Sequence, residues 1–351
     1  MAEPSVEAAA FAGARPGRSA ATQDGAAGDR EVEGAPPSRL RRLLRTLLPW
    51  CVAAAIFAWL FHQVPVADAW EAMRQARLDL FLPVMLVAVV LWFWIDSAAF
   101  AYLFTRFNAQ LPFREARSLR GMTYILTPIN WNLGTAAVIV HLRTSKGISA
   151  LQATSSMLFY QTIDGLVLAA YALVGALMLP LTPEITSLRN GAFIFVVIPI
   201  VSLWLFMSGG PRFRWLVRLR ATELFSSHQT AVVRDVAVLA GLKTVYFSVF
   251  LGMFGFGTAA FGIELPVGLV LASTPIIMMA GALPITPAGL GTQQAAMLYF
   301  YGPYGDEAAI LAFGLLFPIA LVLLRVLIGT LYLRDLPKLR KALEAQRAAS
   351  S

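Results

Sequence analysis

Eight apolar segments follow one another between residues 47 and 332, and charged or turn-forming residues separate them. A helix of about 20 residues crosses the hydrocarbon core of a bilayer. Six segments are long and continuous enough to cross once, and they lie at residues 47–64, 81–104, 151–181, 191–208, 236–263 and 307–332. The composition agrees, because only 14% of the residues are charged, whereas a soluble domain is about one quarter charged. The sequence therefore predicts an all-α, polytopic membrane helix bundle and excludes a soluble globular enzyme.

The two remaining segments, 121–140 and 267–301, are interrupted in the middle. The first break contains Pro128 and an Asn-Trp-Asn stretch, and the second contains prolines and glycines between residues 283 and 292. Proline lacks an amide donor and glycine frees the backbone, so both suit a turn at membrane depth. Non-helical backbone is tolerated there only where protein or a water-filled cavity surrounds it.

The distribution of charge predicts the orientation. Twenty of the 28 Lys and Arg residues fall in 39–46, 105–120, 141–150, 209–235 and the C-terminal tail, and only three fall in the other loops. The positive-inside rule places the twenty, and both termini, in the cytoplasm. Each interrupted segment then has both flanking loops on one side of the membrane, so each is expected to be a re-entrant hairpin. The alternative is that 121–140 spans the membrane and the basic 209–235 loop lies outside.

The two breaks resemble each other at an offset of 157 residues. Residues 126–135 and 283–292 are identical at four of ten positions, including a terminal Leu-Gly-Thr. The same offset relates residues 81–181, as repeat one, to residues 236–332, as repeat two. The two units would have opposite orientations, as in transporters whose sites lie at the repeat interface near the membrane midplane. A chance match in a chain rich in Leu and Gly is the alternative.

The ends of the chain have a different composition. Residues 1–38 carry almost no large apolar side chains, which predicts a disordered cytoplasmic tail, and they contain no apolar run of the kind found in a signal peptide. Residues 39–335 are expected to form the transmembrane domain, and residues 336–351 a basic cytoplasmic tail. We interpret the net charge of +8 as a sign of orientation and of attraction to anionic lipids, with no nucleic-acid partner.

Short motifs resemble those of one known family. Residues 283–296 read LPITPAGLGTQQAA, a Tyr-Gly-Pro-Tyr-Gly turn and two acids follow, and Leu324-Arg325 lies in the last segment. Upstream, Pro128 and Gly134 precede His-Leu-Arg at 141–143 and Gly-Ile-Ser at 147–149. These motifs resemble the lysylphosphatidylglycerol synthase transmembrane family, also called flippase-like, over residues 45–335. Asp164 falls where that family tends to have an acid.

The resemblance implies a lipid-moving protein of the bacterial cytoplasmic (inner) membrane. The best-known members are the flippase halves of the multiple peptide resistance factor, which move aminoacylated phosphatidylglycerol between leaflets. The aminoacyltransferase domain of those synthases is not expected here, because the chain ends nineteen residues after Tyr332. Gln294 replaces a family Glu, and Gln161-Thr162 replaces Glu-Arg. Both changes remove charge, so the substrate preference is not transferred, and hopanoid and glycolipid pathways remain open.

Four ionisable residues lie inside apolar segments: Asp96, Asp164, Lys243 and Arg325. A charge at the centre of a membrane helix costs about 2.5–3.5 kcal/mol on insertion scales, so such residues face a partner or a cavity. Asp164 and Arg325 are candidates for headgroup or proton coupling, or for an ion pair that only holds helices together. For Asp96 and Lys243 we expect a structural ion pair.

The interrupted segments supply the other candidate binding residues. Backbone amides at such breaks, together with the helix N-termini that follow them, suit the phosphate of an anionic lipid. The alternative is that the glycines and prolines only permit turns. The candidates are Pro128, Asn130, Asn132, Gly134, Thr286, Pro287, Gly289, Gly291, Thr292, Gln293 and Gln294.

Catalytic motifs are missing from the sequence. It contains no Gly-x-Ser-x-Gly, no His-Glu-x-x-His and no Walker-type phosphate loop. Its single cysteine, Cys51, cannot form an internal disulfide or a multi-cysteine metal site. We therefore expect no enzymatic activity, no cofactor and no bound metal.

Three functions stay open at this stage. The first is translocation of a lipid, anionic or modified at its headgroup, between leaflets. The second is a non-transporting scaffold for an enzyme of an envelope-lipid pathway, which would be its partner. The third is secondary transport of a small solute.

Overall fold

The computed structural model describes residues 39–126, 131–207, 214–282, 286 and 289–333. The chain divides into two units, residues 1–44 and 45–351, and the following concerns the second. The tails predicted at 1–38 and 336–351 lie outside the described residues. Within the described residues all regular structure is helical, which confirms the all-α prediction. The α-helices are α1 (Arg39–Gln63), α2 (Val66–Gln75), α3 (Leu78–Phe107), α4 (Phe113–Leu126), α5 (Trp131–Lys146), α6 (Ala150–Met178), α7 (Pro183–Met207), α8 (Arg214–Arg220), α9 (Ser226–Thr230), α10 (Val233–Ala260), α11 (Val267–Ala282), α12 (Thr292–Tyr301) and α13 (Glu307–Thr330).

Five of the described helices are long and apolar enough to cross a membrane: α3, α6, α7, α10 and α13. They correspond to five of the six predicted spans. The remaining predicted span, 47–64, lies within α1, which continues to Gln63. The chain bends at Val64 and Pro65, and α2 leaves α1 at an angle of 77°. Proline has no amide to continue the helix. The two helices amount to a sixth span only if the bent pair crosses as one.

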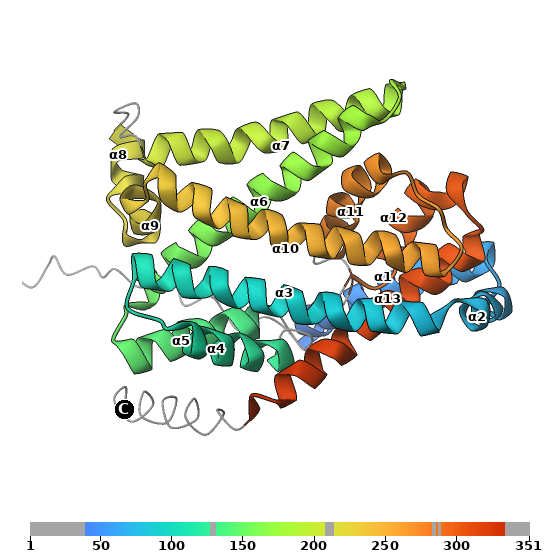
Figure 1. The fold of residues 1–351 in the computed structure, drawn as a ribbon, viewed down its shortest axis with the longest axis horizontal. Helices are drawn as coiled ribbons and strands as arrows, with labels where there is room; N and C mark the ends of the chain where they lie inside the picture. The colour runs from blue at the N-terminus through green and yellow to red at the C-terminus, as the bar shows by residue number, and fades with distance from the viewer. Residues whose placement is uncertain (1–38, 127–130, 208–213, 283–285, 287–288, 334–351) are drawn as a thin grey trace, which may run out of the picture. The chain divides into compact units, whose positions relative to one another are not determined.

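The helix order of residues 78–178 recurs in residues 233–330: one long helix, two short helices and another long helix. α6 begins at Ala150 and α13 at Glu307, which is the offset of 157 residues seen in the sequence. The first long helices of the two halves, α3 and α10, lie side by side and antiparallel (Figure 1). At one end the Arg77 amide donates to the Ala260 carbonyl at 2.9 Å, and at the other Arg106 pairs with Asp235 at 3.0 Å.

Both interrupted segments form pairs of short helices, α4–α5 and α11–α12, which we call the first and the second hairpin. α4 packs against α5, and α11 packs against α12. No helix of these pairs meets the criteria of length and hydropathy for a span. The connecting residues 127–130, 283–285 and 287–288 lie outside the described residues.

Each helix pair also packs on a long helix of the other half. α11 lies against α6, where a Cβ on Gly175 would fall 2.5 Å from the Gly268 carbonyl oxygen. α4 lies against α13, where a Cβ on Gly329 would fall 3.1 Å from the Gly121 carbonyl oxygen. Small residues allow membrane helices to approach this closely. Glycine contacts thus join each half to the hairpin of the other.

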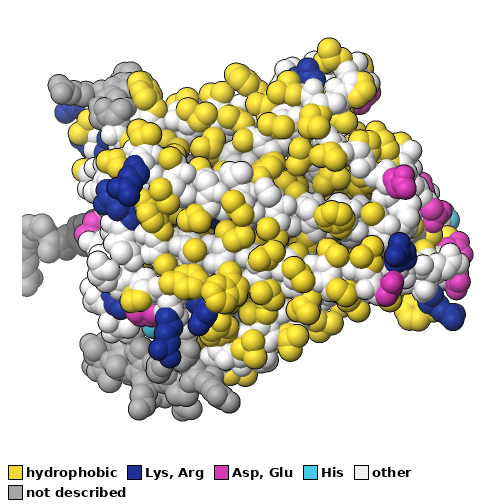
Figure 2. All heavy atoms as spheres, viewed as in Figure 1, with side chains coloured by type: hydrophobic (Ala, Val, Ile, Leu, Met, Phe, Trp, Pro, Cys, Tyr) yellow, Lys and Arg dark blue, Asp and Glu magenta, His cyan; other side chains and the backbone are white. Residues whose placement is uncertain are grey.

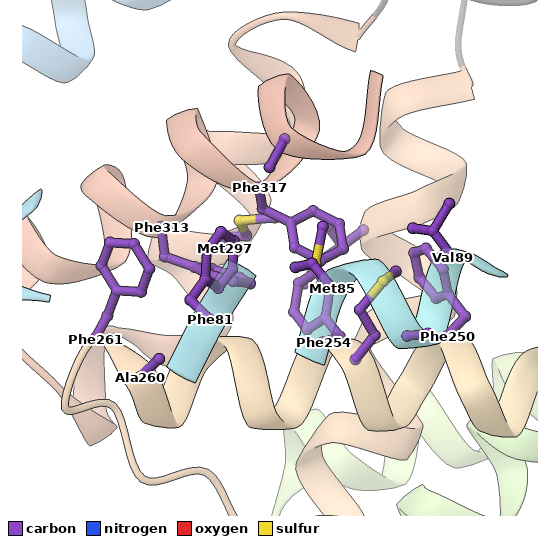
Figure 3. Packing of buried hydrophobic residues seen from close by; sticks show 14 of the residues in the cluster. Phe81, Met85, Val89, Phe250, Phe254, Ala260, Phe261, Met297, Phe313 and Phe317 are labelled. Atoms are coloured by element: carbon purple, nitrogen blue, oxygen red, sulfur yellow. The ribbon is translucent and has the colours of Figure 1, made fainter. Parts of the chain in front are cut away.

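Aromatic residues fill the interface between α3, α10 and α13 (Figure 3). The ring of Phe254 meets that of Phe313 edge-on at 5.1 Å and that of Phe317 at 5.1 Å. Gly257 provides the room, because a Cβ there would lie 2.8 Å from the Phe313 ring. Edge-to-face pairs add about 0.5–1.5 kcal/mol each beyond area burial. This packing fixes the first and last helices of the second half against α3.

Charged and apolar side chains separate on the surface. In the face that Figure 2 shows, apolar side chains cover the middle of the bundle. Asp and Glu gather at the end near α2, while Lys and Arg lie predominantly toward the opposite end, where α3 ends and α10 begins. An apolar band between polar ends is what a bilayer requires of a spanning protein.

Candidate functional site

Three of the four ionisable residues singled out in the apolar segments meet between α3, α6 and α10. The Lys243 ammonium lies 2.7 Å from Asp164 Oδ1 and 3.6 Å from Asp96 Oδ1. Asp96 and Lys243 are therefore within ion-pair distance, as the sequence predicts, but Lys243 is closer to Asp164. Both Asp96 and Lys243 are almost fully buried.

Asp96 has two further partners that bind it directly. The Arg120 guanidinium from α4 and the Tyr160 hydroxyl from α6 both donate to its carboxylate. Burying a charge costs several kcal/mol of desolvation unless hydrogen bonds and an opposite charge offset it. The partners of Asp96, drawn from three other helices, supply that compensation.

Helical spacing explains why these groups converge. Tyr160 and Asp164 are four residues apart and share one face of α6. Lys243 presents its ammonium over the ring of Tyr160 at 3.6 Å and over that of Tyr246, one turn farther along α10, at 4.5 Å. Cation–π contacts of desolvated cations are worth about 2 kcal/mol. The ammonium is thus held by two carboxylates and two aromatic faces.

Arg325 of α13 has different neighbours from those considered in the sequence. Among the described residues no ion pair joins it to Asp164, so an Asp164–Arg325 pair is wrong for this structure. Its guanidinium instead lies over the rings of Trp92 at 4.5 Å and Tyr124 at 5.3 Å. The cause is the packing of α13 on α3 and α4, which brings those aromatic residues nearest, while α10 delivers Lys243 to Asp164.

These groups surround a cavity of about 50 Å³. A water needs roughly 10–15 Å³ on this measure, so the cavity has room for a few waters, and a lipid headgroup would enter only if the walls moved apart. Its walls come from both halves of the chain. The lining residues are Phe100, Arg120, Tyr124, Gly134, Thr135, Val138, Met157, Tyr160, Gln161, Asp164, Lys243, Tyr246 and Arg325.

The first hairpin contributes to this cavity. Of its candidate residues, Gly134 lines the wall beside Thr135. Asn132 lies in α5, and its side chain is outside what the structure describes. Pro128 and Asn130 also lie outside the described residues.

The described candidates of the second hairpin lie elsewhere and make structural contacts. Gly289 and Gly291 have φ values of 71° and 87°, a region that favours glycine. The Gln294 side chain accepts from the Gly291 amide at 2.8 Å and donates to the Gly314 carbonyl of α13 at 2.7 Å. Thr292 donates to the Gly289 carbonyl at 3.0 Å. These bonds hold the turn and attach it to α13.

Three further candidates complete the second hairpin. Thr286 is buried, and Gln293 packs so closely that a Cβ on Gly281 would overlap its amide. Pro287 lies outside the described residues. No described residue of 286–294 lines the cavity, because Gly291 packs against Ile56 and Gln294 against α13. Among the described residues, the cavity is lined by the first hairpin and not by the second.

Sequence reasoning missed several members of the site. It assigned Arg120 to a cytoplasmic basic loop, although this residue immediately precedes the interrupted segment. It also passed over Tyr160, whose spacing from Asp164 is the available signal. Trp92, Tyr124 and Tyr246 look like ordinary apolar helix residues in the sequence. Among the described residues, no three His, Cys, Asp or Glu side chains are placed to hold a metal ion.

Two comparisons with known proteins bear on this arrangement. A family model described as "Lysylphosphatidylglycerol synthase TM region" matches residues 46–329, a range that includes every lining residue of the cavity. None of the curated proteins compared with the chain matches it.

Proposed function

The chain belongs to the lysylphosphatidylglycerol synthase transmembrane family, and on that premise we propose that it moves the headgroup of a membrane lipid from one leaflet to the other. It is a multi-pass integral membrane protein. The proposal places it in the bacterial cytoplasmic membrane, with both termini in the cytoplasm, and assigns it no covalent chemistry.

The observation that carries the proposal is the charged cavity inside the apolar bundle. Five ionisable side chains line or adjoin it: Asp96, Arg120, Asp164, Lys243 and Arg325. Charges in membrane segments are costly and usually mark a pathway or a binding site. A headgroup can pass through such an interior while its acyl chains stay in the surrounding lipid.

The antiparallel halves support the same function. In an inverted repeat, the site lies between the halves, and rocking of one half against the other exposes it to each side in turn. Here α3 and α10 run antiparallel, and the cavity takes lining residues from both halves. We propose that α4–α5 and α11–α12 are re-entrant hairpins that enter from opposite sides, with the Arg-rich end in the cytoplasm.

A reconstituted assay tests the function. The purified chain is placed in liposomes that carry trace fluorescent lipids, and a membrane-impermeant quencher reports the exposed fraction over time. Wild type is expected to move at least one anionic lipid faster than empty liposomes do. Asp164→Asn is expected to slow this movement, because it removes the partner of Lys243 at 2.7 Å.

Glu184→Gln is the matched control. Glu184 is an exposed acid in the first turn of α7, so its loss should leave movement unchanged. If a folded wild-type protein moves none of the fluorescent lipids tested, whether anionic, zwitterionic or cationic, the proposed function is overturned.

A further inference from the structure

We infer that the cavity selects headgroups with a net negative charge and that Arg325 is the residue that binds their phosphate oxygens. This inference rests on the lipid-translocation function proposed above and adds a substrate class to it.

The first argument is the balance of charge. Arg120 pairs with Asp96, and Lys243 pairs with Asp164. Arg325 also lines the cavity, and among the described residues no carboxylate lies within ion-pair distance of it. Three cations therefore face two carboxylates, which leaves an excess of one positive charge when all five are ionised. A charge without a partner in a low-dielectric site favours a ligand of opposite sign.

The second argument is the way Arg325 is held. The rings of Trp92 and Tyr124 lie 4.5 Å and 5.3 Å from the guanidinium carbon. Its Nε is buried and has no hydrogen-bond partner in the structure. An aromatic ring near a guanidinium interacts with its charge and accepts none of its in-plane N–H donors, which stay available for phosphate oxygens. Arg325 is thus oriented, positively charged and short of an acceptor.

The third argument concerns cationic headgroups. Aromatic faces and free carboxylates are the usual sites for an ammonium ligand. Here Lys243 occupies the faces of Tyr160 and Tyr246, and Arg325 occupies those of Trp92 and Tyr124. Both acids are already paired. A lysyl headgroup would meet a positive cavity in which the groups able to receive it are engaged.

The test compares three fluorescent lipid probes with the same acyl chains in the same proteoliposomes. They are phosphatidylglycerol, which is anionic, phosphatidylethanolamine, which is zwitterionic, and lysylphosphatidylglycerol, which is cationic. Wild type is expected to move the anionic probe fastest. Arg325→Gln is expected to slow that probe by about tenfold, the loss typical of one charge-assisted hydrogen bond, and to reduce the preference over the zwitterionic probe. Arg325→Lys should retain much of the preference, because it keeps the charge.

Arg218→Gln is the control for a general effect of positive charge, since Arg218 is an exposed residue of α8 outside the cavity. It should leave both rate and preference unchanged. If Arg325→Gln fails to fold, the comparison of three probes on wild type still tests the preference for anionic headgroups, and Arg325→Lys, which cannot bind two phosphate oxygens as a guanidinium does, tests the role of Arg325 by its slower movement of the anionic probe.

The outcomes separate the two proposals. Movement of the zwitterionic or cationic probe as fast as the anionic one overturns this inference while leaving translocation intact, and so does an unchanged preference in a folded Arg325→Gln protein. Absence of any lipid movement by wild type overturns the function itself. A parallel measurement follows uptake of radiolabelled inorganic phosphate. Uptake that requires Arg325, without lipid movement, would keep the anion site and overturn the lipid as its source.

Discussion

Lys243 of α10 lies 2.7 Å from Asp164 of α6, and this ion pair joins the two halves of the chain at the wall of the cavity. The ammonium is also 3.6 Å from Asp96. One buried cation thus serves two carboxylates that lie on different helices.

Removing that cation should destabilise the fold. In Lys243→Met, Asp96 keeps Arg120 and Tyr160, but Asp164 loses its ion-pair partner. Breaking a buried pair from one side costs about 3–5 kcal/mol, measurable as the free energy of unfolding in a detergent titration. Lys146→Met is the control, because its partner Glu115 is partly exposed, and such pairs are worth about 0–1 kcal/mol. Equal losses in the two variants would contradict a special role for Lys243.

The contact between α6 and α11 should not tolerate a methyl group. In Gly175→Ala the new Cβ would lie 2.3 Å from the Ala272 backbone nitrogen, and backbone cannot give way as a flexible side chain can. Overpacking of this kind costs about 1–3 kcal/mol. Gly165→Ala on the same helix meets nothing within 4 Å and should instead raise stability by about 0.5–1 kcal/mol. The two melting temperatures should shift in opposite directions.

Gln294 should not tolerate replacement by Glu. Gln294→Glu replaces the amide donor to the Gly314 carbonyl with an acceptor, so two oxygens would face each other in a buried contact. The expected loss of unfolding free energy is about 1–3 kcal/mol. Gln152→Glu, at an exposed position on α6, controls for the added charge. A stable Gln294→Glu protein would show that the contact adapts.

His228 should make the stability of the α9 region depend on pH. It lies in α9, outside the candidate spans, and burial lowers the pKa of its imidazole from 6.5 to about 4. The folded state therefore resists a proton that the unfolded state accepts. Stability is complete above pH 6.5 and falls as the pH drops from 6.5 toward 4. The protection factors of the amides of 226–230 against hydrogen exchange, which correct for the intrinsic pH dependence of exchange, should fall over that range, and His228→Gln should remove this fall.

Cysteine labelling tests the orientation. In a Cys51→Ala background, Tyr304→Cys should react with a membrane-impermeant maleimide added to intact cells. Ser145→Cys should react only after the cells are opened. Both side chains are exposed in the structure, so accessibility within the protein does not explain a difference. External labelling at position 145 would contradict the re-entrant arrangement of α4 and α5.

The sequence predicts the positions of the long helices better than it predicts the contacts between them. Hydropathy predicts the length of α3, α6, α10 and α13, because a bilayer imposes it, and prolines lie between α4 and α5 and between α11 and α12. It does not specify the rotation of a helix about its axis or which helices touch. The sequence therefore does not predict that Asp164 is closer than Asp96 to Lys243, or that Arg325 lies over the ring of Trp92. The sequence does not single out Arg120, because it is the last of several arginines in the basic 105–120 segment.

The reciprocal packing of α11 on α6 and of α4 on α13 has a mechanical consequence. At Gly175 the backbone of α6 lies directly against that of α11, and at Gly329 the closest atoms of α4 are the Ile125 side chain and the Gly121 carbonyl oxygen. A tilt of α6 must displace the short helices of the second half, and a tilt of α13 must displace those of the first. We therefore expect movements of the two halves to be coupled, so that a displacement of α6 or α13 in one half moves the short helices of the other half.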